Sequence, residues 1–374
     1  MAASQSLNTG VSPLINEDEI LADRYSASGN VTEARRVFEK ILENKELPSL
    51  ARARIHKKIG NTYTSQWDFE ASLVHYQNAS EQLQQIIGSP GWFTEWINLQ
   101  IDYSYALHST HHFDQLDKLV LQLKPVIAEH GTDRQKINYL KIIYYRLLKK
   151  HRWFMLPEES LTHCQAIILL ADKEQDPETK AWGTTMLGFC HLWRHEPKPA
   201  KLYCGKALQL LQHLKYDEMT AGAYSGMAYA YRKERNIQQA SMWAEKALAH
   251  AQQNNNLAYE MTSLAVKSWV LLKREDVDAA ETAARKVYEF FKQFRHPFLP
   301  FCLPVLISIA LQKNNIEQAA QYAFVLLHPE GQQLPDEITR YLKEGVALWG
   351  EKNITAAGAV LQKAITVADE TGFL

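Results

Sequence analysis

Small and apolar residues alternate with polar ones along this chain in a pattern that repeats about every forty positions. Each repeat contains a small residue that is followed four and seven positions later by further small or apolar residues, as Ala200 is followed by Cys204 and Ala207. These offsets lie on one face of a helix. The recurring small residues are Ser160, Ala200, Ala240, Ala280, Ala319 and Ala357. Self-similarity at one period predicts a solenoid of stacked helical units instead of one closed core.

A second periodic apolar run precedes each of these helices and carries a short residue of its own, such as Gly188, twelve positions upstream of the recurring one. Turn-forming residues such as Arg235 and Asn236 separate the two runs. Each unit is therefore predicted to be two antiparallel helices that approach closely at their small residues. Pro300 and Pro304 fall where one first helix is expected, so that helix is predicted to start late or to kink.

This pattern resembles the tetratricopeptide repeat. The best matches are LGFCHLWRHEPKPAKLYCGKAL from Leu187, MAYAYRKERNIQQASMWAEKAL from Met227 and IGNTYTSQWDFEASLVHYQNA from Ile59. The resemblance implies an all-α fold, an α-solenoid wound as a right-handed superhelix of about nine helix-turn-helix repeats. The expected organisation is a single superhelical domain over residues 16–374, after a disordered segment over residues 1–15.

A narrower resemblance comes from the middle of the chain. TEWINLQIDYSYALHSTHHF from Thr94 and MLGFCHLWRHEPKPAKLYCGKALQLL from Met186 are similar to the repeat arm of bacterial signal-transducing ATPases and cyclases, the MalT-like STAND regulators. In that family the arm senses a small ligand or a protein and holds the ATPase inactive until the ligand binds. The nucleotide-binding domain of those proteins has no counterpart in this sequence.

Composition and charge exclude several classes of function. The chain has 374 residues, 46% of them hydrophobic, and a formal net charge of −1, which argues against attraction of the whole molecule to nucleic acid or to a membrane. The four cysteines form no CxxC pair and are expected to be small core residues in a reducing compartment. No charged start followed by an apolar run marks an export signal, so a cytoplasmic location is expected.

Motifs for catalysis are missing from the sequence. It contains no GxxxxGK[ST] phosphate loop, no GxGxxG, no HExxH and no GxSxG, so neither enzyme activity nor a cofactor is expected. Two groups of side chains have the spacing of metal ligands: His108, His111 and His112, and Cys190, His191 and His195. A structural zinc site needs four ligands and neither group offers a fourth, so no metal is expected.

The inner surface of the predicted superhelix is where a partner is expected to bind. In tetratricopeptide proteins the first helix of each repeat lines the concave groove, and the residue after the upstream small position points into it. That register gives an aromatic and basic stripe. The predicted partner-binding groove comprises Tyr105, Lys149, Arg152, Trp153, Phe189, Trp193, Tyr229, Arg232, Lys233, Trp269 and Lys273.

Aromatic and arginine side chains provide large contact area and charge-assisted hydrogen bonds, so an extended or helical peptide with acidic groups is the expected guest. The alternative is that these aromatic side chains only pack against the neighbouring repeat. The leading functional hypothesis is a non-enzymatic module that binds a partner protein or peptide, as part of a larger complex or alone. The second hypothesis is a regulatory module that senses a ligand.

A third hypothesis rests on the segment from Asp133 to Phe154. Basic residues dominate this segment and aromatic residues, including Tyr144, Tyr145 and Trp153, are interleaved with them. Such a run is typical of contacts with single-stranded nucleic acid, through phosphates and stacked bases, or with an acidic protein surface. It is equally typical of one helix with a solvated basic stripe.

Overall fold

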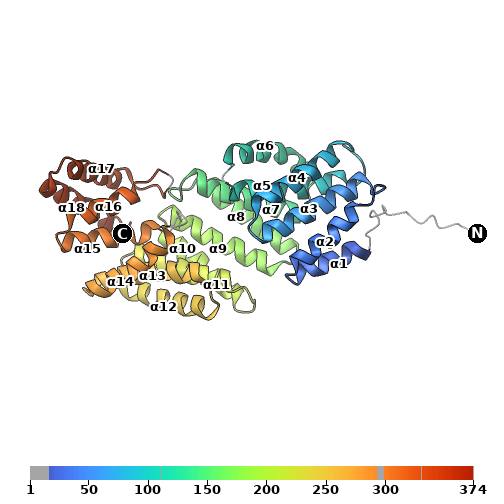
Figure 1. Ribbon diagram of the computed structural model, residues 1–374. Coiled ribbons are helices and arrows are strands. Elements are labelled where there is room, and N and C mark those ends of the chain that lie inside the picture. Colours follow the sequence, from blue (N-terminus) through green and yellow to red (C-terminus); the bar gives the residue numbers. More distant parts are fainter. Residues whose placement is uncertain (1–16, 111, 293–298, 330, 374) are drawn as a thin grey trace, which may run out of the picture. The chain divides into compact units, whose positions relative to one another are not determined.

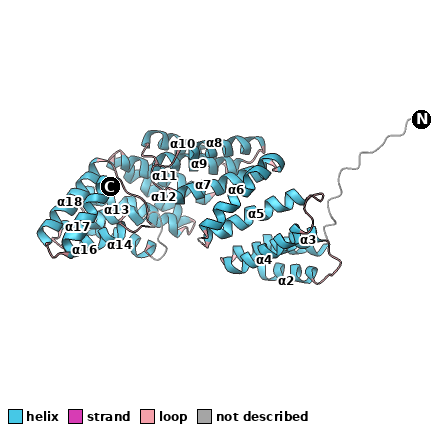
Figure 2. Cartoon of the chain, turned by 90° about the horizontal axis from the view of Figure 1, so that it is seen from above, coloured by secondary structure: helices cyan, strands magenta, loops and turns pink. Residues whose placement is uncertain are grey.

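The computed structural model describes residues 17–110, 112–292, 299–329 and 331–373. Within these residues the chain forms eighteen α-helices and one short 3-10 helix, and it contains no strand (Figures 1 and 2). The predicted all-α solenoid class is confirmed. The segment 1–15, predicted to be disordered, and His111 lie outside the described residues. Among the described residues no helix combines the length and the apolar composition that crossing a bilayer requires.

Two compact units make up the chain, with a boundary between Ile143 and Tyr144, inside a helix. The helices of the first unit are α1 (Glu17–Ala27), α2 (Val31–Leu42), α3 (Ser49–Ser65), α4 (Phe69–Gln84), α5 (Trp92–Ser109), α6 (Phe113–His130) and the first part of α7 (Asp133–Lys150). Successive helices pack as pairs, α1 with α2, α3 with α4 and α5 with α6. Phe38, Ile55 and Ile59 form part of one core cluster between these helices.

The second unit contains the end of α7 and the remaining helices. These are α8 (Glu158–Lys173), α9 (Pro177–Trp193), α10 (Pro197–Leu211), α11 (Asp217–Lys233), α12 (Ile237–Gln253), α13 (Leu257–Lys273), α14 (Val277–Phe291), η1 (Leu299–Phe301), α15 (Leu303–Gln312), α16 (Ile316–Leu326), α17 (Asp336–Gly350) and α18 (Ile354–Glu370). From α9 onwards consecutive helices pack as pairs, each joined by a short turn. Among the first helices, α11 also contacts both α9 and α13, and we call the surface that these three helices form the inner face.

The recurring small residues lie where the paired helices touch. All six of them, from Ser160 to Ala357, have no exposed surface. The small partner positions are needed as well, because a Cβ added at Gly188 would lie 2.7 Å from Cys204 Sγ and one at Gly345 would lie 2.7 Å from Leu361 Cγ. The forty-residue period therefore arises because each repeat places small residues at the contact between its two helices, as the sequence predicted.

The turn between the two helices of a pair is also repeated. A residue with left-handed backbone precedes the residue that caps the second helix, at His195, Arg235, Glu275, Asn314 and Lys352. In most of these turns the cap is an Asn or Asp side chain that accepts a hydrogen bond from a backbone N–H of the first helical turn, as Asn236 accepts from Gln239 at 3.1 Å. Local chemistry thus fixes the start of each second helix.

The prolines have the predicted effect on α15. The chain first forms the 3-10 helix η1, which contains Pro300, and α15 begins only at Leu303, with Pro304 in its first turn. Proline is tolerated there because the backbone N–H groups of the first turn need no helical acceptor. As a result α15 has 10 residues, whereas α13 has 17.

Candidate functional site on the inner face of the second unit

Ten of the eleven predicted groove residues belong to the second unit. Lys149 lies at the end of α7, and Arg152 and Trp153 lie in the turn after it. The others lie on the three inner helices: Phe189 and Trp193 on α9, Tyr229, Arg232 and Lys233 on α11, and Trp269 and Lys273 on α13. The eleventh residue, Tyr105, lies on α5 in the first unit, where it is 49% exposed and its ring lies 6.0 Å from that of Phe69.

One part of this region is an open, aromatic hollow of about 310 Å³. Three predicted residues, Trp153, Phe189 and Trp193, contribute to its wall. The full aromatic lining consists of Tyr144, Tyr145, Trp153, Trp182, Phe189, Trp193, Tyr216 and Tyr259, completed by Leu148, Met186, Met219 and Glu218. We call this site the aromatic hollow.

The aromatic hollow has a buried floor and an accessible rim. Tyr144 is 1% exposed and Trp182 is 5% exposed, and their rings meet edge to face with centroids 5.7 Å apart. At the rim Tyr145 is 41% exposed, while Tyr216 and Tyr259 are half-buried. Edge-to-face contacts of this kind hold the rings in fixed orientations. The floor is therefore a preformed apolar surface.

Neutral hydroxyl groups supply most of the polar character of the hollow. Burial, and secondarily the nearby carboxylate of Glu218, raises the pKa of the Tyr216 phenol and of the Tyr259 phenol. Both hydroxyls are therefore uncharged hydrogen-bond donors at neutral pH. Glu218 is exposed and is the only charged side chain in the lining.

The sequence predicted only part of this lining. Tyr144 and Tyr145 belong to the basic and aromatic segment that was noted for its composition, whereas Trp182, Tyr216 and Tyr259 were missed. Trp182 lies seven positions before Phe189 on α9, so helical spacing would have placed both on one face. Tyr216 and Tyr259 lie at the starts of α11 and α13, outside the register that defines the predicted groove.

The other part of the inner face is covered by the C-terminal repeats of the same chain. Phe301 of η1 lies over Tyr229, with ring centroids 4.3 Å apart, and stacks against Trp193 at 5.9 Å. Its carbonyl oxygen accepts a hydrogen bond from Arg232 Nη1 at 3.1 Å. Tyr229 and Arg232 are 3% and 2% exposed, and Trp269, on the neighbouring helix α13, is 0% exposed.

A loop before α17 covers the turn that follows α7. Arg152 Nε donates to the Gly331 carbonyl at 2.8 Å, and its own carbonyl accepts from the Gln333 N–H at 2.9 Å. Gln332 Nε2 donates to the Trp153 carbonyl at 2.9 Å. These bonds join residues that are about 180 positions apart in the sequence. Arg152 is thus occupied by the chain itself.

The end of α18 covers the C-terminal ends of α11 and α13. Asp369 forms ion pairs with Lys273 at 2.6 Å and with Arg235 at 3.1 Å. The ring of Phe373 stacks on His195 with centroids 5.6 Å apart, and Lys233 Nζ lies 5.7 Å above the same ring. We call these contacts of residues 369–373 the C-terminal seam.

The histidines of the Cys190 group contact neighbouring side chains. His191 Nδ1 lies 2.6 Å from Glu196 Oε2, and His195 Nδ1 lies 3.2 Å from Lys233 Nζ. Within the described part of the chain no group of three or more His, Cys, Asp or Glu side chains is placed to hold a metal ion. His111 of the other group lies outside that part.

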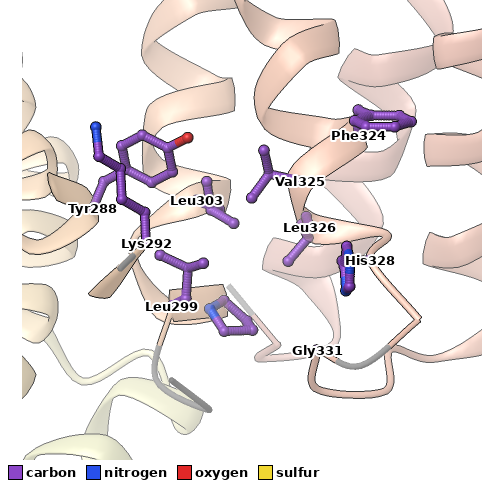
Figure 3. A pocket seen from close by; sticks show the side chains of 10 residues that line it. Tyr288, Lys292, Leu299, Leu303, Phe324, Val325, Leu326, His328 and Gly331 are labelled. Carbon is purple, nitrogen blue, oxygen red and sulfur yellow. The ribbon is translucent and has the colours of Figure 1, made fainter. Parts of the chain in front are cut away.

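A second pocket, of about 260 Å³, lies between α14, η1 and α16. Figure 3 shows Tyr288, Leu299 and Leu303 on one side of it and Val325, Leu326 and His328 on the other. Lys292 and Gly331 of its lining adjoin residues 293–298 and 330, which the structure does not describe. The aromatic hollow is therefore the better-defined site.

Solved structures share this architecture. A Signal Transduction ATPase with Numerous Domains (STAND) protein with a tetratricopeptide repeat sensor, from Pyrococcus horikoshii, aligns over 92% of this chain with a TM-score of 0.56 and 14% identity. The apo form of RapI aligns over 95% of this chain and 96% of its own, with a TM-score of 0.63 and 12% identity. The chain has the all-α solenoid fold of these two structures. It spans about half the length of the STAND protein, 50% of which is covered.

Sequence comparisons give no closer relationship. No family model matches the chain. No curated protein matches it either. At 12% and 14% identity the solved structures establish the fold, and the function must be argued from the inner face itself.

Proposed function

We propose that the second unit is a non-enzymatic binding module that holds a peptide segment of a partner protein in the aromatic hollow. The observation that supports this proposal best is the hollow itself, a concave site of about 310 Å³ with a buried aromatic floor and an exposed aromatic rim. Concave, mostly apolar sites with a few placed polar groups are the usual binding sites of folded domains. Tetratricopeptide solenoids bind partners along such inner surfaces.

The chemistry of the lining indicates the character of the bound segment. Aromatic and methionine side chains favour an apolar or aromatic side chain of the partner, since such contacts bury large areas with few rotatable bonds. The hydroxyls of Tyr216 and Tyr259 are suited to donate to the carbonyl groups of a peptide backbone. Glu218 is suited to accept from its N–H groups.

A sensing role is a second candidate. Its support is the cover that the C-terminal repeats place over the rest of the inner face, because a ligand that displaced the cover would rearrange these repeats. The STAND protein with a similar fold carries a tetratricopeptide repeat sensor. A scaffold in a larger complex and a sensor arm both have to bind a partner or ligand on the inner face. One binding experiment therefore tests the requirement that the two roles share.

The experiment uses a phage-displayed peptide library selected against the full-length protein. Enriched peptides are synthesised and their dissociation constants are measured by fluorescence anisotropy. The test variants are Tyr145→Ala and Tyr216→Ala, two changes at the rim that leave the buried floor intact. We expect each change to weaken binding by about tenfold or more, as loss of an aromatic contact residue does.

Leu169→Ala is the matched control, because Leu169 is 71% exposed on α8 and is not part of the lining. This variant should bind the selected peptides like the wild type. Circular dichroism establishes that all three variants remain folded. If selected peptides bind the rim variants and the wild type with equal affinity, the aromatic hollow is not the binding site and the proposal is wrong.

A further inference from the structure

The C-terminal seam joins one acidic group to a surplus of basic groups. Lys273 and Arg235 pair with Asp369, while Arg232 and Lys233 lie beside them on α11. Among the described residues Asp369 is the only carboxylate that pairs with any of these four cations. The seam therefore contains more positive charge than its own carboxylate neutralises.

Arg232 is the least satisfied of these cations. Its side chain is 2% exposed, and within the part of the chain that the structure describes only Nη1 has a hydrogen-bond acceptor, the carbonyl of Phe301. Among the described residues Nη2 has no hydrogen-bond partner although it is buried, and the same is true of Nε1 of Trp269, whose ring lies 5.8 Å from the guanidinium carbon. Buried polar groups without partners are uncommon in folded proteins and destabilise the state that buries them.

Burial affects the charge of both α11 cations. Desolvation lowers the pKa of Arg232 to about 10 and the pKa of Lys233 to about 7. Each shift means that the surroundings disfavour the charged form. A further anionic group at this position would reverse the effect, because an opposite charge within a few ångströms favours the charged form of a base.

Residues 369–373 place a carboxylate and an aromatic ring next to the cations of the C-terminal seam. Asp369 provides a carboxylate, and Phe373, four positions later, provides a ring that stacks on His195 and lies under Lys233. Gly372 passes so close to α11 that a Cβ on it would lie 2.4 Å from the carbonyl oxygen of Lys233. The segment thus fits against the inner face as a short peptide would.

We propose that residues 369–373 are a built-in occupant of a second peptide site, whose natural ligand is an acidic and aromatic segment of the partner protein. In the free protein Asp369 takes the place of the partner's carboxylate and Phe373 takes the place of its ring. The partner segment displaces both and brings an additional acidic group to Arg232 and Lys233. This inference rests on the proposed function in that the partner binds the inner face, but the site is separate from the aromatic hollow.

The test uses a labelled peptide with the sequence DETGFL and an amidated C-terminus, so that only side-chain carboxylates carry negative charge. Its affinity is measured by fluorescence anisotropy for the full-length wild type and for the double variant Asp369→Asn/Phe373→Ala. The wild-type site is occupied and should bind the peptide weakly. The double variant should bind it about tenfold tighter or more, because the competing groups are removed.

Two controls define the interaction. The peptide NETGAL, which lacks the carboxylate of the first residue and the ring, should bind neither protein. Glu370→Gln changes the neighbouring exposed carboxylate and should leave the affinity at the wild-type value. A folded double variant that binds DETGFL no better than the wild type does would overturn the proposal.

Hydrogen exchange on the wild type keeps the proposal testable if the double variant does not fold. The N–H of Phe373 donates to the Ala368 carbonyl at 2.8 Å, so it should exchange slowly in the free protein. Roughly 1 mM DETGFL should accelerate this exchange, because it competes with the segment for the site. Unchanged exchange would overturn the proposal. Binding of the library peptides to the aromatic hollow is measured separately. A negative result with DETGFL therefore overturns the second site and leaves the proposed function unaffected.

Discussion

Small residues determine how closely the helices of each repeat can approach. Ala240 is fully buried, and its N–H donates to the Asn236 carbonyl at 2.9 Å in the first turn of α12. Larger side chains at such positions force neighbouring helices apart or into strained rotamers. The close contacts found at Gly188 and Gly345 have the same origin.

Ala240→Leu is therefore predicted to destabilise the second unit by roughly 1–3 kcal/mol, through overpacking between α11 and α12. Urea denaturation followed by tryptophan fluorescence measures the change. Ala249→Leu is the matched control, because Ala249 lies on the same helix and is exposed. If both variants unfold at the wild-type urea concentration, Ala240 does not occupy a tight helix contact.

His195 makes the stability of the second unit sensitive to acid. Burial, followed by the nearby charge of Lys233, lowers the pKa of His195 from its ordinary 6.5 to about 3. Between these two values the unfolded chain binds a proton that the folded chain does not, so stability is lost as the pH falls through this window. Above 6.5 the group has no such effect. The largest expected loss is roughly 1.4 kcal/mol per pH unit.

His195→Asn removes this group while keeping a residue that tolerates the left-handed backbone at this position, where φ is 60°. We expect the variant to lose less stability than the wild type between about pH 7 and about pH 4.5. The measurement is the urea midpoint of the second unit at both pH values. Equal losses in the two proteins would show that His195 is not responsible.

At the scale of elements, the sequence predicted the helix pairs well because they depend on local rules. Periodic apolar residues, small contact positions and Asn or Asp caps all act within one repeat, as at Asn236 and Ala240. The late start of α15 followed from Pro300 and Pro304 for the same reason. Element type and approximate boundaries can thus be inferred without knowing the rest of the fold.

The site was harder to infer because its surroundings come from distant parts of the chain. Nothing in the local sequence of Tyr229 or Arg232 indicates that Phe301 will cover both. Phe189 and Trp193, which the register assigned to the groove, lie on α9 and line the aromatic hollow. Partner binding by the predicted groove residues remains a prediction.

The short helix η1 is predicted to contribute strongly to this cover. Phe301→Ala should destabilise the second unit by roughly 3–5 kcal/mol, because Phe301 is 8% exposed and its removal leaves a cavity over Tyr229. Phe324→Ala is the control, since Phe324 is 67% exposed on α16. Thermal or urea unfolding of both variants gives the comparison. A Phe301 variant as stable as the control would mean that the cover adds little stability.

At the scale of the whole molecule, a solenoid without long-range contacts behaves as a one-dimensional array. Each repeat then contacts only its neighbours, and terminal repeats open before central ones. The first unit fits this description in that its helix contacts join elements close together in the sequence. Continuity of a single superhelical domain across α7, over residues 16–374, remains a prediction.

The second unit departs from a simple array because its end returns to its beginning. Arg152 donates to the carbonyls of Gly331 and His328, at 2.8 Å and 3.4 Å, and these bonds connect the turn after α7 with the loop before α17. Such contacts between distant repeats couple their opening, so α17 and α18 should be protected from hydrogen exchange nearly as well as α9 and α11. The C-terminal seam and the loop before α17 together couple the opening of α17 and α18 to that of α9 and α11.

Arg152→Asn is the variant that tests the coupling. Asparagine tolerates the left-handed backbone of this position, where φ is 48°, but it cannot reach both carbonyls. Amide exchange in α17 and α18 should become about tenfold faster or more, while exchange in α9 and α11 changes little, since losing two charge-assisted hydrogen bonds removes more than about 1.4 kcal/mol. Arg340→Ala, an exposed change on α17, should leave all rates unchanged. Uniform acceleration across α9 to α18 in the Arg152 variant would instead show that the unit opens only as a whole.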